Sequence, residues 1–97
     1  MNSYHCSSDA NADLAEIVRY SFDLNPAAAH GFLDSLEETC ELLAEHPFIG
    51  RPRAELGEGL RSFPVGNYLI FYTLAARGID VARVIYGGCD LPNVFGR

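Results

Sequence analysis

The first half of the chain carries apolar residues at helical spacing. In its first segment these residues recur three, one and four positions apart: Leu14, Ile17, Val18 and Phe22. Ser8 or Asp9 is suited to cap such a segment, because a short polar side chain can accept a hydrogen bond from a free N–H of the first turn. The pattern therefore predicts a helix over about residues 10–23.

A second helix is predicted to begin at Asn25-Pro26. Asparagine is a favoured cap, and proline fits the first helical position because its missing N–H is not needed there. The apolar stripe that follows consists of Ala29, Phe32, Leu33, Leu36, Cys40 and Leu43. Pro47 ends the helix. Because only two or three residues link the two helices, they are expected to fold back on each other as an antiparallel hairpin.

The second half of the chain changes to short runs of aromatic and β-branched residues, which are typical of strands. Three such runs are present: Leu60–Val65, Tyr68–Leu74 and Ile79–Tyr86. Two turns of hairpin length, Gly66-Asn67 and Ala75 to Gly78, separate them and predict three antiparallel strands. Pro64 cannot donate a ladder hydrogen bond, so an edge or a bulge is expected there. The segment 48–53 holds glycine and proline too close together for regular structure and is predicted to be a crossing loop.

The run Tyr68 to Tyr72 is apolar at consecutive positions, so both faces of that strand need cover. The helical hairpin can cover one face. The other is left to the remaining residues, to a second copy or to a partner chain. Ser3 to Ser7 is a candidate fourth strand at an edge. The predicted fold is α+β, an N-terminal helical hairpin packed on a twisted antiparallel sheet of three to four strands, with residues 1–97 forming one domain.

Composition narrows the possible chemistry. Residues 1–50 hold nine acids and one arginine, whereas residues 51–97 hold four acids and six arginines. The chain has no lysine, which excludes a lysine nucleophile or Schiff base. The net charge of −6 argues against a protein that binds nucleic acid by bulk attraction.

Cysteine and histidine spacing indicates neither a metal site nor a disulfide framework. Cys6, Cys40 and Cys89 are odd in number and lack C-x-x-C spacing. The three histidines, at positions 5, 30 and 46, share no ligand spacing. No targeting or membrane-spanning segment is recognisable, so a cytoplasmic protein without metal or cofactor is expected.

Three segments carry a pattern that is specific in order and spacing. They are His46-Pro47-Phe48-Ile49-Gly50-Arg51-Pro52, the run LRSFPVGNYLIFY from Leu60 to Tyr72, and Val81-Ala82-Arg83-Val84-Ile85-Tyr86-Gly87-Gly88. Together with Ala12-Asp13-Leu14-Ala15-Glu16-Ile17, they resemble the ParE branch of the ParE/RelE toxin family. The resemblance extends from about residue 10 to Phe95.

The resemblance implies a toxin of a type II toxin–antitoxin pair. Such a toxin is held inactive by a ParD-like antitoxin in a hetero-oligomer, and it acts by binding DNA gyrase rather than by catalysis. RelE-type relatives share the fold and cleave mRNA on the ribosome. This chain lacks their lysines, has Leu69 after Tyr68, and has Phe95 where they carry a tyrosine. Gly88-Cys89 stand where many relatives have a histidine and arginines, so a degenerate toxin that only binds antitoxin is the other alternative.

The resemblance also suggests binding residues. Arg61 and Arg83 lie where the family pattern places arginine and would shape the surface that faces antitoxin or target. The alternative is that each is a strand arginine with its head in water or paired to an acid such as Asp80 or Asp90. Tyr72, Cys89 and Phe95 complete the candidate binding set, and no catalytic residue is predicted. The antitoxin is expected to place apolar anchors over the sheet and hairpin, with acids pairing to Arg51, Arg53, Arg61 or Arg83.

Overall fold

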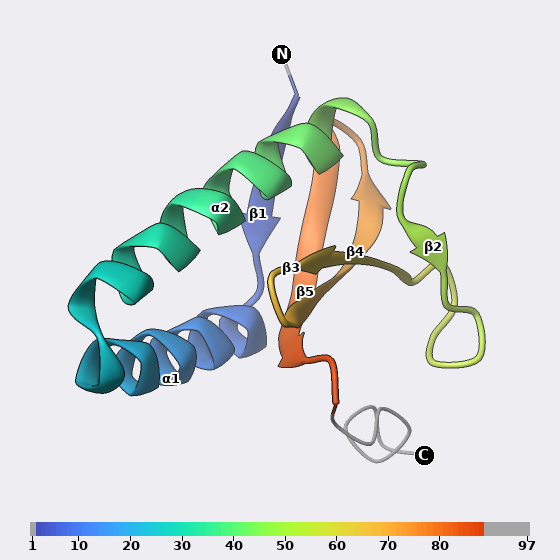
Figure 1. Ribbon diagram of the computed structural model, residues 1–97. Coiled ribbons are helices and arrows are strands. Elements are labelled where there is room, and N and C mark those ends of the chain that lie inside the picture. Colours follow the sequence, from blue (N-terminus) through green and yellow to red (C-terminus); the bar gives the residue numbers. More distant parts are fainter. Residues whose placement is uncertain (1, 89–97) are drawn as a thin grey trace.

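In the computed structural model, which describes residues 2–88, a helical hairpin lies against one face of a sheet (Figure 1). The elements in chain order are β1 (Ser3–Cys6), α1 (Ser8–Leu24), α2 (Pro26–Glu45), β2 (Arg51–Pro52), β3 (Arg61–Val65), β4 (Tyr68–Ala75) and β5 (Gly78–Tyr86). The helices meet at the Asn25 end and diverge toward the sheet. The predicted α+β class and the predicted hairpin are confirmed.

Both helices begin at side-chain caps. Ser7, rather than Ser8 or Asp9, caps α1, because its Oγ accepts the Ala10 N–H at 3.0 Å. Asn25 alone links the helices, and its Oδ1 accepts the Ala27 N–H at 3.0 Å. Of the helices in residues 2–88, neither is long and apolar enough to cross a membrane.

The sheet is larger than predicted and mixed in direction. Its strand order is β1-β5-β4-β3-β2, and β1 runs parallel to β5 while the other pairs are antiparallel. Backbone groups place β1, since Ser3 N–H donates to the Arg77 carbonyl at 2.7 Å and Ser7 N–H to the Val81 carbonyl at 2.9 Å. Gly78 permits this contact, because a Cβ there would lie 1.8 Å from the Ser3 oxygen. Because backbone groups make this pairing, the four-residue polar sequence of β1 shows no hydrophobic alternation that would reveal it.

The strands from β3 to β5 lie where the sequence predicts them. Val65 pairs with Tyr68 around the predicted first turn, and Ala75 pairs with Gly78 around the second. The predicted crossing loop contains the two-residue strand β2, which pairs only with Arg61 and Ser62. Pro64 lies beyond that pairing, on a part of β3 that has β4 alone as neighbour, as expected for an edge proline.

Both faces of β4 are covered by the chain itself. The main core, between the helices and the sheet, holds buried Ile17, Leu36, Cys40, Leu43, Ile70, Tyr72, Ile79, Val81 and Val84 among others. On the opposite face, Leu60 and partly buried Leu56 pack with Phe71 and Ile85. The sequence left open whether this face is covered by the remaining residues, by a second copy or by a partner chain. The remaining residues cover it, through the loop between β2 and β3.

Burial of Cys40 leads to a prediction about thiol reactivity and stability. Its side chain is 1% exposed, and burial raises the pKa of the thiol to about 12. We expect iodoacetamide at pH 8 to alkylate Cys40 more slowly than half-buried Cys6 by about tenfold or more, because the thiolate is the reactive form. Since the raised pKa favours the neutral thiol of the native state, its stabilising contribution is present below pH 9 and is lost as pH rises toward 12.

Peptide mass spectrometry of labelled samples, with a urea-unfolded control, measures the two rates. The rates should converge in urea. Equal labelling of Cys6 and Cys40 in the native protein would contradict the buried position.

Candidate functional site

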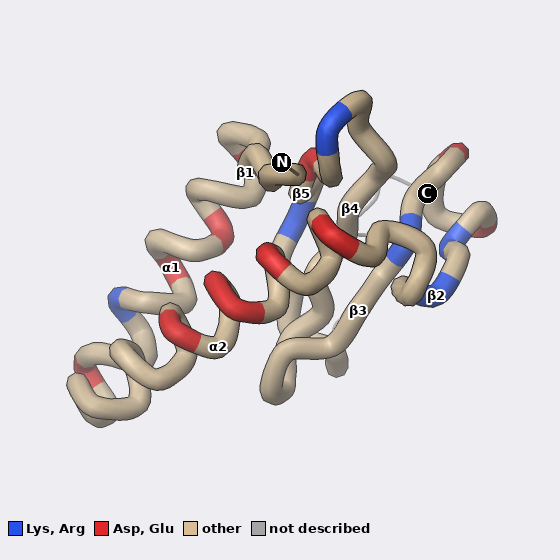
Figure 2. The backbone as a smooth tube through the Cα atoms, turned by 90° about the horizontal axis from the view of Figure 1, so that it is seen from above, with Lys and Arg blue, Asp and Glu red and all other residues tan. Residues whose placement is uncertain are grey.

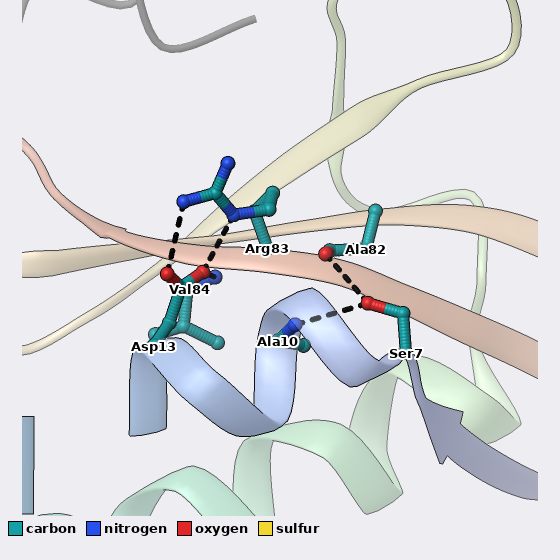
Figure 3. Close-up of polar contacts among 6 residues, drawn as sticks. All are labelled: Ser7, Ala10, Asp13, Ala82, Arg83 and Val84. Atoms are coloured by element: carbon teal, nitrogen blue, oxygen red, sulfur yellow. Dashed lines mark hydrogen bonds and ion pairs between the residues drawn. The ribbon is translucent and has the colours of Figure 1, made fainter. Parts of the chain in front are cut away.

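Two side chains at the start of α1 join it to β5 just beyond the end of β1 (Figure 3). Ser7 Oγ, besides capping the helix, donates to the Ala82 carbonyl at 2.8 Å. The Asp13 carboxylate accepts from Arg83 Nε at 2.7 Å, from Arg83 Nη2 at 2.9 Å and from the Val84 N–H at 3.0 Å. We call this arrangement of Ser7, Asp13, Arg83 and Val84 the Asp13 junction. It satisfies polar groups of β5 where the neighbouring strand stops.

The Asp13 junction decides how much of Arg83 is available to a partner. Its guanidinium makes a two-point ion pair with Asp13, and the side chains are 30% and 16% exposed. The hydrogen bond to Asp13 raises the pKa of Arg83, opposed by desolvation. The alternative interpretation of Arg83, that it is a strand arginine paired to an acid, is therefore correct. The acid is Asp13 rather than Asp80 or Asp90. A role for Arg83 in partner binding stays a prediction.

An open groove of about 290 Å³ lies between α1 and the last residues of β5. Its lining consists of Asp13, Glu16, Ile17, Tyr68, Arg83, Val84, Ile85 and Tyr86. Tyr68 contacts Phe32 and Tyr86, with ring centroids 5.3 and 5.9 Å apart, and Tyr86 is 54% exposed. In the described chain, β1 pairs with β5 only as far as Val81, so no strand covers β5 beside this β5 groove, although Ser7 and Asp13 engage the Ala82 carbonyl and the Val84 N–H there. Aromatic side chains beside such an edge suit an added polypeptide segment.

A second site forms where α2 ends, around the four-residue Phe48 loop (Pro47–Gly50). Tyr72 reaches it from the centre of β4 and is fully buried. Its hydroxyl donates to the Pro47 carbonyl at 2.9 Å and accepts the Gly50 N–H at 2.9 Å. Burial raises the pKa of this phenol, with the Gly50 hydrogen bond and Arg61 acting in the opposite direction. Tyr72 therefore fixes both ends of the loop, and any effect of Tyr72 on binding acts through the loop.

Arg61 holds the same loop from β3. Its Nη1 donates to the Phe48 carbonyl at 3.1 Å and to the Gly50 carbonyl at 2.7 Å. Its guanidinium carbon lies 5.2 Å from the centre of the Phe48 ring, within the range of a cation–π contact. The Phe48 and Ile49 side chains remain 68% and 49% exposed.

The structure thus separates the predicted site residues into two places. Arg61 and Tyr72 meet at the Phe48 loop, whereas Arg83 belongs to the Asp13 junction beside the β5 groove. Cys89 and Phe95 lie outside the described residues. Sequence reasoning missed the roles of Asp13 and Phe48, although both lie in segments that carry the family pattern.

The side chains that the sequence singled out at these two places make contacts within the fold. Within residues 2–88, no group of three His, Cys, Asp or Glu side chains is placed to hold a metal ion. Every buried side-chain nitrogen and oxygen in that range has a hydrogen-bond partner. The aromatic groove and the projecting apolar loop are features of binding surfaces, and Tyr20, Phe22 and Leu24 are further exposed apolar side chains, on α1.

Comparison with known proteins gives a consistent result. Residues 4–90 match the family model described as the ParE toxin of the type II toxin–antitoxin system parDE. The chain is 34% identical to Toxin ParE1 of Caulobacter vibrioides, over 89% of this chain and 90% of that protein. It is 27% identical to Toxin ParE3 of the same organism, over 90% and 88%. A solved structure of the chromosomal ParDE system from P. aeruginosa superposes with a TM-score of 0.73 at 21% identity, covering 89% of this chain and 96% of that one, and shows the same fold.

Proposed function

Because the chain belongs to the ParE toxin family of type II toxin–antitoxin systems, we propose that it inhibits DNA gyrase by binding and that a ParD-like antitoxin neutralises it in a hetero-oligomer. The protein works in the cytoplasm, where gyrase is found. It needs no cofactor, it does not act as an enzyme, and it binds no nucleic acid on its own.

The observation that carries this proposal is that Arg61 and Arg83, the two arginines of the family pattern, both make hydrogen bonds within the fold. RNA cleavage needs a base, an acid and free positive charge to stabilise the phosphate in the transition state. Arg83 is paired with Asp13, and Arg61 donates to two loop carbonyls. With no lysine in the sequence, these contacts leave neither of the two family-pattern arginines free to bind a phosphate, which favours inhibition by binding over an mRNA nuclease.

The β5 groove is the place for the antitoxin. An extended segment can lie along the end of β5 that β1 does not cover and set apolar side chains against Ile17, Tyr68 and Tyr86. Arg83 is paired with Asp13 in the groove wall, so the groove offers the antitoxin apolar and aromatic contacts more than free positive charge.

Expression of the chain alone in bacteria tests the function. We expect growth arrest with filamentation and SOS induction, and the purified protein should inhibit gyrase supercoiling and increase cleaved DNA. Co-expression of the short reading frame that adjoins the toxin gene should restore growth. Arrest without SOS induction and with cut mRNA would support the nuclease alternative instead. Soluble protein without any effect would support the degenerate toxin.

A further inference from the structure

The Phe48 loop presents an apolar surface whose purpose the fold does not explain. Phe48 and Ile49 are 68% and 49% exposed, although both are large apolar side chains next to a well-formed core. Arg51 follows them and is exposed as well. We call Phe48, Ile49 and Arg51 the Phe48 patch.

The backbone beneath the Phe48 patch is held in place before any partner arrives. Four hydrogen bonds with two side chains fix it: the Tyr72 hydroxyl accepts one and donates one, and Arg61 donates two. A loop ordered in advance loses little conformational entropy on binding, and this raises the affinity gained from each contact. Aromatic side chains, phenylalanine included, and arginine are enriched at protein–protein interfaces.

The Phe48 patch contains Arg51 and lies beside Arg53 and Arg61, although Glu55 and Glu58 follow in the next loop. Figure 2 shows arginine positions gathered around β2 and the start of β3, whereas most Asp and Glu positions follow α1 and α2. Within residues 2–88, no carboxylate lies in ion-pair distance of Arg51 or Arg61, while Arg53 is 3.6 Å from Glu55. The patch therefore suits a surface that offers carboxylates around an apolar pocket.

The Phe48 patch and the β5 groove lie toward opposite edges of the sheet. The strand order β1-β5-β4-β3-β2 puts the groove at β5 and the loop beside β3 and β2. The groove is hollow and suits an extended segment, whereas Phe48 projects and does not line it. A projecting ring needs a concave site on a folded partner. Of the four arginines that the sequence assigned jointly to the antitoxin, Arg83 alone is at the groove.

We propose that the Phe48 patch binds the protein that the toxin inhibits, with Phe48 entering an apolar pocket whose rim carries carboxylates that pair with Arg51. The antitoxin then occupies a different surface, the β5 groove. This inference rests on the proposed function, because it takes gyrase as the inhibited protein.

Two variants and two matched controls test the proposal with purified gyrase. Phe48→Ala and Arg51→Glu are each expected to raise the toxin concentration for half-inhibition of supercoiling by about tenfold or more. Tyr20→Ala removes an aromatic ring that is 65% exposed on α1, and Arg77→Glu reverses an exposed charge in the turn before β5. Both controls should inhibit like the unsubstituted chain. All four substituted side chains are exposed, so the thermal unfolding of the variants should differ little, with Phe48→Ala slightly less stable because it loses the contact with Arg61.

The outcomes separate the inference from the proposed function. Inhibition by the unsubstituted chain together with equal inhibition by Phe48→Ala overturns the inference and leaves the function standing. If the unsubstituted chain arrests growth without inhibiting gyrase, the target is wrong, and retention or loss of arrest in the same variants decides the inference. If it does neither, both are overturned.

Two binding measurements exclude other occupants of the patch. Affinity for the antitoxin, measured by calorimetry, should be unchanged in Phe48→Ala and Arg51→Glu. A selective loss of antitoxin affinity would assign the patch to the antitoxin and overturn the inference. Binding of a short DNA duplex that disappears in Arg51→Glu would assign the patch to nucleic acid and overturn it as well.

Discussion

Replacing Asp13 by alanine is expected to lower the free energy of unfolding by about 2–3 kcal/mol. The substitution leaves the Arg83 guanidinium, 30% exposed, without its carboxylate and deprives the Val84 N–H of its acceptor. For a domain of this size, the change corresponds to a melting temperature lower by roughly 10–20 °C. Thermal and urea unfolding followed by circular dichroism measure it.

Two further variants identify the cause. Asp13→Asn keeps an oxygen for the Val84 N–H but removes the charge, so an intermediate loss is expected. Glu16→Ala removes a carboxylate of the same helix whose pair with Arg19 is 71% and 73% exposed, and a change within about 0.5 kcal/mol is expected. If Asp13→Ala were no more destabilised than Glu16→Ala, the junction would not hold α1 to β5.

Replacing Gly50 by alanine is expected to lower the free energy of unfolding by about 2–4 kcal/mol. The new Cβ would lie 2.1 Å from the Tyr72 hydroxyl and 2.8 Å from two ring atoms. Tyr72 is fully buried and anchored at Pro47, so the ring has no room to move aside. Either the Phe48 loop shifts or Tyr72 loses its two hydrogen bonds. Urea unfolding measures the loss, and gyrase inhibition by the folded fraction should fall with it.

Gly31→Ala is the matched control, with the opposite expected sign. Gly31 lies on the exposed side of α2, where a Cβ would have no atom within 4 Å. Alanine is the better helix former, so a gain of about 0.5–1 kcal/mol is expected. Equal effects of the two substitutions would show that the close approach of Gly50 to Tyr72 is unimportant for stability.

Local chemistry made much of the fold predictable. The start of α2 at Asn25-Pro26 and the hairpin turn at Gly66, with its φ of 59°, depend on neighbouring residues alone. The apolar spacing identified the helix faces, and consecutive apolar residues in β4 correctly indicated that both of its faces are covered. The parallel direction of β1 and the pairing of β2 could not be predicted, because backbone hydrogen bonds between distant segments decide them.

The candidate site divided in the same way. The sequence pointed to Arg61, Arg83 and Tyr72 by residue type and family pattern, and the structure places all three at points where distant segments join. What each one contacts was not predictable, since Asp13 and Arg83 are 70 positions apart and Tyr72 and Pro47 are 25 apart.

The sequence by itself determined the helical hairpin, the three central strands and the membership in a toxin family, because periodicity, turn residues and a specific pattern are all carried by nearby positions. Only the tertiary structure decided that Arg83 is tied to Asp13, that Tyr72 and Arg61 hold a loop, and that Phe48 projects beside Arg51. The physical reason is that hydrogen bonds and exposure depend on which distant groups meet once the core has formed.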